Sequence, residues 1–593
     1  MHREKEHAGT KKAAGHPRAY GSAPFCIFCG RVPGRHGGSA GKKFVCGASL
    51  RRALLCASQL FLPRRKKPDA LPRRLARRPV FLWGNFPWGE FSAPLYALYT
   101  ALLGIALYLL LSFEKEGNYF RLHRVVGAAV FAGAVLFYLA FYVFCAVYRL
   151  KSYSSVCFDF GIFVQMFHSM RQGLGMVTTL ERNTLMSHFS VHFSPIYYLF
   201  LPFYAVFPAA LTLLILQVLT TAASIVPAYL LCREKGLSKA MTGLFCAALL
   251  FSPVLGGGCL YDLHENCFLP VLLLWLFYFF GRGKYFPAFL FAALTMCVKE
   301  DAPVYLAFAA LYFLLSAPRL LQKRARRRQA AAAGMLFLLS VGIFFTVTAL
   351  MKQFGNGIMS NRYESLIGKQ GSLVDLIRIA FTNPDAILRS LCDQGDKITY
   401  VLLVLLPLGA LPLLTKKWER FVLLCPLVLC NLMPGYEYQH QLFFQYSFGP
   451  FAFLAFAAIL NLADLGGQRR RFFSMLCVLC SLWLAVGLLP QRAAVYFKYD
   501  AQAKKYDAVA AALAALPRDA SVSASTCYAV PLAQRSEIYS FEAYPCAYDT
   551  EYIVLDLRYE GERDRSLAYE QNGNFEQCAY VPGYLVIYHR IGS

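Results

Sequence analysis

Apolar stretches recur along most of this chain, and short polar loops separate them. Twelve such stretches can be recognised, near residues 93–112, 124–148, 209–231, 241–258, 267–281, 285–298, 303–318, 334–352, 399–415, 420–433, 446–463 and 473–490. A straight membrane span needs about 20 apolar residues, so we expect the shorter stretches to be tilted, broken or extended by polar flanks. The pattern predicts an all-α polytopic membrane protein with about 11–12 transmembrane helices.

Composition supports a membrane protein whose main partner is the lipid bilayer. The chain is 57% hydrophobic and only 16% charged, whereas soluble domains carry about 25% charged residues. The net charge of +26 is concentrated in residues 1–80, which hold 19 Lys and Arg against three acids. Two interpretations of this segment stay open: a disordered basic tail, or sequence outside the mature protein because the start is mis-assigned. Nucleic-acid binding is not expected.

Positive charge in the loops predicts the orientation of the chain. Lys and Arg are enriched in cytoplasmic loops, and five basic loops fall on one side of the predicted spans: 233–239, 282–284, 319–328, 416–420 and 469–471. We therefore expect a multi-pass membrane protein with these five loops in the cytoplasm. The expected domains are an N-terminal pair of helices, an outer loop with interface helices, a transmembrane core with its own outer loop, and an extracytoplasmic C-terminal domain: 81–148, 149–208, 209–490 (with loop 353–398) and 491–593.

The last hundred residues differ in character from the rest. Residues 499–516 have the pattern of a helix, and residues 521–525, 536–540, 552–556 and 584–588 have the alternation of short strands. We expect a small α/β domain on the outer face.

Three polar clusters interrupt the apolar chain. Asp159 opens the first outer loop, Asp262, His264 and Glu265 lie between two spans, and Lys299, Glu300 and Asp301 occupy a break between two apolar helices. By the predicted topology all three reach the same face. Ionisable residues at the edge of a membrane core favour a functional hypothesis. Structural roles stay open beside it: Asp159 as a helix N-cap, residues 262–265 as ordinary loop, residues 299–301 as a self-neutralised turn, and the histidines as hydrogen-bonded loop residues.

Converging carboxylates can act as general acid or base on a hydroxyl group. Cations can stabilise the charge on a leaving phosphate. We predict catalytic roles for Asp159, Glu300 and Asp301. The predicted substrate-binding residues are His192, Asp262, His264, Glu265, Lys299 and Arg362. No metal ligands are assigned, and a requirement for a divalent metal stays open.

Four ordered motifs carry a family resemblance: FDFGIFVQ from Phe158, HFSPIYYLFLPFY from His192, YDLHE from Tyr261 and VKEDAPVYL from Val298. The region from about residue 150 to 560 resembles a bacterial family of predicted membrane proteins of unknown function (domain-of-unknown-function family 2079). That family is similar to the C-type glycosyltransferase superfamily. The resemblance implies transfer of a sugar from a polyprenyl-phosphate donor on the outer face, with Asp159 as the essential acid of the first outer loop. Gln445 stands where we would expect a histidine.

We therefore predict a glycosyltransferase-like membrane enzyme that uses a polyprenyl-phosphate-linked sugar. Two alternatives belong to other classes. A transporter or flippase needs charges buried in mid-span, and a non-catalytic membrane scaffold needs only its outer domain to bind a partner.

Overall fold

The computed structural model describes residues 100–101, 104–105, 124–354, 362–368, 371, 373–541 and 549–591. All of them belong to one compact unit, Ala76–Ser593. The predicted basic segment 1–80 and most of the predicted span 93–112 lie outside the described residues.

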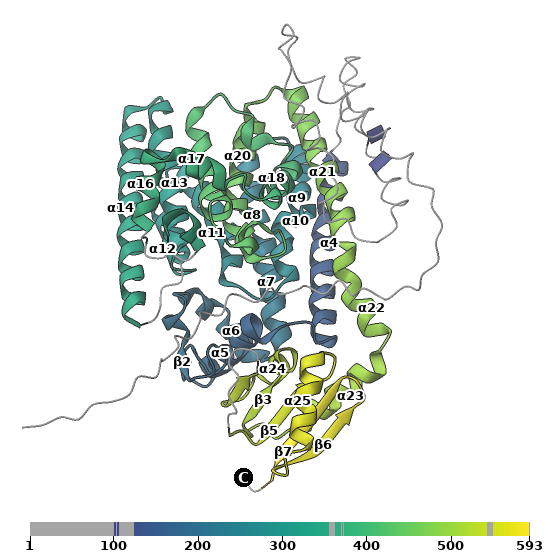
Figure 1. Cartoon of the computed structure of the whole chain (residues 1–593). Helices are drawn as coiled ribbons and strands as arrows, with labels where there is room; N and C mark the ends of the chain where they lie inside the picture. Colours follow the sequence, from purple (N-terminus) through teal and green to yellow (C-terminus); the bar gives the residue numbers. More distant parts are fainter. Residues whose placement is uncertain are drawn as a thin grey trace, which may run out of the picture. The chain divides into compact units, whose positions relative to one another are not determined.

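Long apolar helices make up the body of the described chain (Figure 1). Their bounds are α4 Arg124–Lys151, α7 Ala210–Ala223, α8 Ile225–Glu234, α9 Lys239–Phe251, α11 Leu269–Gly281, α12 Tyr285–Met296, α13 Ala302–Ser316, α14 Lys323–Phe354, α18 Gly395–Leu405, α20 Phe448–Asp464 and α21 Gly467–Leu488. A single helical turn, α10 Pro253–Gly256, follows α9. Shorter helices are α5 Ile162–Arg171, α6 Leu201–Val206, α15 Glu364–Ile367, α16 Leu373–Thr382, α17 Pro384–Ser390, α19 Cys425–Leu427, α22 Ala494–Asp500, α23 Ala503–Ala514, α24 Thr526–Leu532 and α25 Glu560–Glu570.

Six helical segments of the described residues are long and apolar enough to cross a membrane. They are Arg124–Lys151, Ala210–Glu234, Ala302–Arg319, Lys323–Met351, Gln445–Asp464 and Gly467–Asp500. The pair Lys239–Phe251 and Pro253–Leu260, bent by 46°, would make a seventh, and Glu265–Gly281 and Tyr285–Met296 are shorter apolar helices. The prediction of a polytopic helical membrane protein is confirmed.

Prolines explain why the predicted spans 399–415 and 420–433 are not continuous helices. Helix α18 ends at Leu405, and Pro407 and Pro412 then lie in 3-10 turns. Pro426 follows a further 3-10 segment and precedes a π-helical turn. Proline lacks the amide hydrogen that an α-helix interior requires, so this apolar region folds as broken helix.

A glycine triplet brings the second polar cluster into the bundle. A Cβ atom on Gly256 would lie 2.0 Å from the Tyr142 ring of α4, and one on Gly257 would lie 2.1 Å from the carbonyl oxygen of Leu442. A Cβ atom on Gly258 would lie 2.5 Å from the Phe448 ring of α20. Only glycine permits these backbone approaches, and the chain leaves this turn directly into Tyr261 and the cluster that follows it.

The C-terminal part forms the predicted small α/β domain, whose sheet has five strands, one more than the four predicted. The strands are β3 Val522–Ala524, β4 Ile538–Ser540, β5 Tyr552–Asp556, β6 Phe575–Val581 and β7 Leu585–Arg590, in the order β4-β3-β5-β7-β6. Strand β3 pairs in parallel with β4 and β5, and β7 pairs antiparallel with β5 and β6. The predicted helix 499–516 is divided between α22 and α23, with a turn at residues 501–502.

The sheet is hydrogen-bonded to the loop that follows α4. This loop contains a short hairpin, β1 Val177–Thr178 and β2 Met186–Ser187. Within it, the Asn183 side chain accepts from the amide of Ser540 at 2.9 Å and donates to its carbonyl oxygen at 2.7 Å. The Thr526 hydroxyl of α24 accepts from the amide of Cys157 at 3.0 Å. The C-terminal sheet therefore supports the loop that carries Asp159.

The basic loops contact one another in two groups. Arg282 lies 3.7 Å from Glu234, and Arg319 pairs with Glu419. Arg420 lies 2.7 Å from Asp464, at the end of α20. The basic loops and the polar clusters lie at opposite ends of the helices. A helix with one end in a basic loop has its other end near a polar cluster or the C-terminal sheet.

Candidate active site

Asp159 lies on a π-helical turn, Cys157–Gly161, between α4 and α5. Its carboxylate accepts a 2.5 Å hydrogen bond from the Tyr261 hydroxyl, and Nε2 of His264 lies 3.7 Å from its other oxygen. The N-cap of this turn is Val156, and no side chain caps it. The Asp159 side chain therefore does not act as a helix N-cap, which was its structural alternative.

The surroundings of Asp159 keep its carboxylate ionised. Burial by itself raises the pKa of Asp159, but the charge of His264 and the hydrogen bond from Tyr261 outweigh burial, so the pKa is lowered. The pKa of His264 is raised, because Asp159 outweighs the effect of burial. The Asp159 side chain is 30% exposed, whereas that of His264 is 6% exposed. An ionised, reachable carboxylate can accept a proton from a bound hydroxyl group.

Asp262 pairs with a cation at the end of α4. Nη2 of Arg149 lies 3.0 Å from its carboxylate, and the same guanidinium donates to the carbonyl oxygen of Leu260 at 2.6 Å. Gln217 of α7 fixes the segment by accepting from the His264 amide and donating to the Asp262 carbonyl oxygen. Burial raises the pKa of Asp262 in spite of the opposing charge of Arg149. This arrangement gives Asp262 a role in holding the turn.

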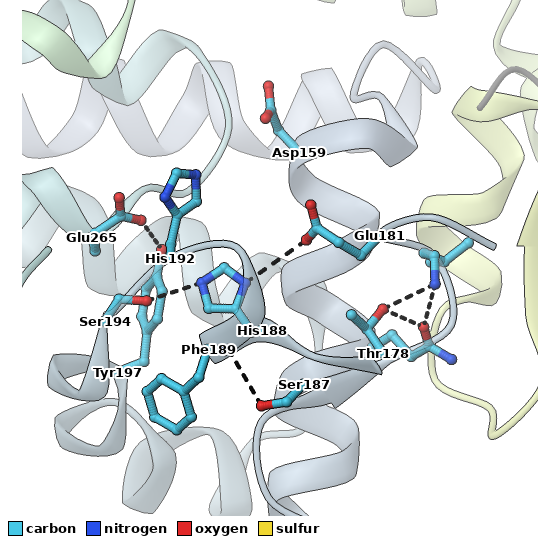
Figure 2. A network of polar contacts seen from close by, with 12 residues as sticks. Asp159, Thr178, Glu181, Ser187, His188, Phe189, His192, Ser194, Tyr197 and Glu265 are labelled. Carbon is cyan, nitrogen blue, oxygen red and sulfur yellow. Dashed lines mark hydrogen bonds and ion pairs between the residues drawn. The ribbon is translucent and has the colours of Figure 1, made fainter. Parts of the chain in front are cut away.

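Glu265 and Lys299 form a buried ion pair across two clusters. Nζ of Lys299 lies 2.6 Å from Oε1 of Glu265, and the side chains are 3% and 0% exposed. The Tyr197 hydroxyl donates to the other Glu265 oxygen at 2.9 Å (Figure 2). Burial lowers the pKa of Lys299, but the charge of Glu265 outweighs it and raises the pKa overall. The Lys299 ammonium group is therefore paired with the Glu265 carboxylate.

Glu300 binds the loop that carries His192. Its Oε1 lies 3.0 Å from Nδ1 of His192, and its Oε2 accepts from the Phe193 amide at 3.2 Å. Burial by itself raises the pKa of Glu300, but the charge and hydrogen bond of His192 outweigh it and hold the pKa at about 2. Glu300 stays ionised at neutral pH, and it orients the His192 ring.

Arg362 is the cation of this region that no described carboxylate pairs with. Its guanidinium carbon lies 5.7 Å from the centre of the Tyr436 ring and 5.1 Å from that of Tyr446. The charges of Asp301 and Glu300 help to raise its pKa against the effect of burial. Burial raises the pKa of Asp301. A guanidinium held between two aromatic rings can take a phosphate oxygen without breaking an ion pair.

The contacts bring the three predicted clusters together. Asp159 contacts the second cluster through His264. The second cluster contacts the third cluster through the Glu265–Lys299 ion pair. The charge of Lys299 also helps to lower the pKa of Asp159. The charges of Arg362 and Asp159 act in opposite directions on the pKa of Tyr436. Contacts and chain adjacency join eight of the nine predicted site residues, and Arg362 is linked to Asp301 and Glu300 only through its charge. Asp262, Glu265, Lys299 and Glu300 are each engaged by a partner in the protein.

Sequence reasoning missed four residues that position this network. Tyr261 donates to Asp159, Arg149 pairs with Asp262, Gln217 holds the turn, and Tyr197 donates to Glu265. Tyr261 belongs to the YDLHE motif and could have been proposed from it. Tyr197 lies in the HFSPIYYLFLPFY motif and could likewise have been proposed. Arg149 and Gln217 lie on helices far along the chain from their partners, and no local pattern marks them.

The described residues contain no group of three or more His, Cys, Asp and Glu side chains placed to hold a metal ion. Asp262 and Glu265 are each paired with a cation instead, and Asp159 and Glu300 each lie beside a histidine. These residues do not fit a resident divalent ion.

Comparisons with known proteins place the chain in a family. The crystal structure of ArnT from Cupriavidus metallidurans bound to undecaprenyl phosphate is similar, with 13% identity, a TM-score of 0.48, and coverage of 78% of this chain and 98% of that chain. The structure of the same protein in the apo state has 11% identity, a TM-score of 0.43, and coverage of 75% and 96%. No curated protein matches the sequence significantly. The family model described as "Predicted membrane protein (DUF2079)" matches residues 149–583, and the chain belongs to that family.

Proposed function

We propose that this protein is a membrane glycosyltransferase-like enzyme that moves a sugar from a polyprenyl-phosphate donor to a hydroxyl group. The observation that carries the proposal is the ionised, partly exposed carboxylate of Asp159, held by Tyr261 and His264 beside cations at the end of the bundle. The four motifs resemble a family that is similar to the polytopic C-type glycosyltransferases, and this resemblance supports the same reaction class.

Asp159 is the general base in this proposal. It takes the proton of the acceptor hydroxyl group as the acceptor oxygen forms a bond to C1 of the sugar. The bond between C1 and the phosphate oxygen breaks, and the leaving polyprenyl phosphate keeps the bonding electrons. Arg362 binds the phosphate and stabilises the charge that develops on it. Glu300 keeps His192 oriented toward the same space.

The lipid tail of the donor needs an apolar surface beside the site. The segment before α7 exposes Tyr198, Leu199, Phe203, Val206 and Phe207, although neighbouring Tyr197 and Tyr204 are fully buried. An amphipathic segment of this kind suits the membrane interface. We propose that it lies there and guides the polyprenyl chain toward Arg362.

The same proposal puts the polar clusters and the C-terminal sheet on the extracytoplasmic side of the bacterial cell membrane, opposite the basic loops. Two variants test this orientation. Leu185 is 74% exposed in the loop after α5, and Leu321 is 98% exposed in a basic loop. In intact cells, a membrane-impermeant maleimide should label Leu185→Cys, whereas Leu321→Cys should react only after permeabilisation. Peptide mass spectrometry identifies the labelled cysteine, and the reverse labelling pattern would contradict the orientation.

The reaction itself is tested with the purified protein in lipid nanodiscs. The protein should consume radiolabelled undecaprenyl-phosphate sugars and release undecaprenyl phosphate when a hydroxylated acceptor such as a methyl glycoside is added. Thin-layer chromatography of the lipid fraction measures donor loss. If a panel of hexose and pentose donors stays intact with acceptors present, the enzyme proposal is rejected.

A transporter or flippase gains no specific support from the described residues. Such a protein would place its titratable groups within the spans. Here Asp159 precedes α5, the second cluster precedes α11, and the third cluster precedes α13. The clusters therefore lie at helix ends, where a lipid headgroup meets water.

A further inference from the structure

Four aromatic side chains form a continuous row beside the proposed active site. Successive ring centres lie 5.0 Å, 4.7 Å and 4.6 Å apart, which is the range of direct ring contact. The members of this aromatic row are, in order, Tyr436, Tyr438, Phe444 and Tyr261. The row therefore offers a run of ring surface and not a set of isolated rings.

The two ends of the aromatic row lie at the two groups to which the proposed reaction assigns chemistry. At one end, the guanidinium carbon of Arg362 lies 5.7 Å from the centre of the Tyr436 ring. The Gly435 amide also donates to the carbonyl oxygen of Arg362 at 2.9 Å, which ties the two segments together. At the other end, the Tyr261 hydroxyl donates to the Asp159 carboxylate at 2.5 Å. The row thus joins the cation proposed for the phosphate to the proposed general base.

The aromatic row can be reached from outside the protein, most openly at Tyr436. This residue is 41% exposed, although three neighbouring side chains pack around its ring. Its chain neighbours Gly435 and Glu437 are exposed as well, and the other three members of the row are partly exposed. No described side chain has to move before a ligand can contact the Tyr436 ring.

The proposed displacement requires the sugar ring to lie between Arg362 and Asp159. When one oxygen displaces another directly at C1, the entering and leaving oxygens lie on opposite faces of the sugar. The leaving phosphate oxygen is assigned to Arg362 and the entering hydroxyl group to Asp159, so the ring lies between them, where the aromatic row runs. Burial raises the pKa of Tyr436, and the charge of Asp159 raises it further, so this carboxylate also acts on the far end of the row.

We propose that the aromatic row is the subsite for the sugar ring of the lipid-linked donor, and that the sugar stacks on Tyr436. The C–H groups on one face of a pyranose ring are apolar and slightly positive, whereas the face of an aromatic ring is apolar and negative. The ligand class is therefore a pyranose with an unbroken face of C–H groups. Tyr436 binds and orients this ring but takes no part in the bond changes. The assignment of the sugar to the donor rests on the proposed function.

Two simpler roles for Tyr436 make different predictions. A tyrosine that anchors the protein at the membrane interface acts equally on the binding of every lipid. A ring that only supports the Arg362 guanidinium affects every lipid phosphate equally. A sugar platform, in contrast, acts only on a lipid phosphate that carries a sugar.

Lipid binding to the detergent-solubilised full chain tests the subsite without turnover. Native mass spectrometry measures the affinity for a panel of hexose and pentose esters of undecaprenyl phosphate and for undecaprenyl methyl phosphate, which has the same charge but no sugar ring. Wild type should bind at least one sugar ester about tenfold more tightly than the methyl ester. Tyr436→Leu keeps apolar bulk but removes the ring, so it should lose most of this difference and bind the methyl ester as the wild type does.

Two control variants complete the experiment. Tyr436→Phe keeps the ring and should keep the difference in affinity. Tyr580→Leu alters a tyrosine of β6 that is 54% exposed and should bind both kinds of lipid as the wild type does.

Three results would each overturn the subsite: no preference for any sugar ester in wild type, an equal loss for both kinds of lipid in Tyr436→Leu, or loss of the preference in Tyr436→Phe. The turnover assay separates this result from the proposed function. Donors that stay intact with acceptors present reject the enzyme even if sugar-dependent binding persists. A donor that is consumed but bound no better than the methyl ester overturns the subsite alone.

Discussion

Asp159→Asn should abolish sugar transfer and leave the protein folded and inserted. The substitution keeps the size of the side chain and an oxygen that can accept from Tyr261, but it removes the basic carboxylate. General-base catalysis contributes about a hundredfold to ten-thousandfold, so we expect turnover of the lipid-linked sugar to fall by at least about a hundredfold. The readout is the release of undecaprenyl phosphate from wild-type and variant protein in nanodiscs.

The matched control is Asp500→Asn, which changes an exposed aspartate at the end of α22. Its turnover should equal that of wild type. Donor binding separates a chemical defect from a binding defect, because Asp159→Asn should still bind the donor through Arg362. Unchanged turnover in Asp159→Asn would remove this carboxylate from the mechanism and, with it, the main support for the enzyme proposal.

The sequence predicts the helical bundle because apolar runs near 20 residues have few other outcomes. It also predicts the strands β3, β4, β5 and β7, whose residues alternate or are fully apolar. Strand β6 was missed. It is an edge strand with most side chains exposed, so Glu576, Gln577 and their neighbours give no apolar alternation.

The site could be predicted only as a list of ionisable residues. Their partners follow from packing between helices that are distant in the sequence, and a single sequence holds no sign of it. Lys299 illustrates the limit: three charges in an apolar run predicted a cation for the donor phosphate, yet its ammonium group is held by Glu265. Arg362, predicted beside it, is the cation without a described ionic partner.

Lys299→Met should destabilise the protein strongly. It leaves the Glu265 carboxylate, which is 0% exposed, with only the hydrogen bond from Tyr197. Removing one partner of a buried ion pair typically costs about 3–5 kcal/mol, whereas replacing both partners by apolar residues is often neutral. We expect a large fall in the thermal midpoint for Lys299→Met and recovery of most of it in the double variant Lys299→Met/Glu265→Met.

The comparison variant is Arg389→Met on α17, which breaks an exposed pair with Asp385, the two side chains being 79% and 62% exposed. Exposed pairs contribute about 0–1 kcal/mol, so the midpoint of this variant should hardly move. Midpoints come from size-exclusion profiles of detergent-solubilised protein after heating. If the thermal midpoint of Lys299→Met equalled that of Arg389→Met, the Lys299–Glu265 pair would not hold the second and third clusters together.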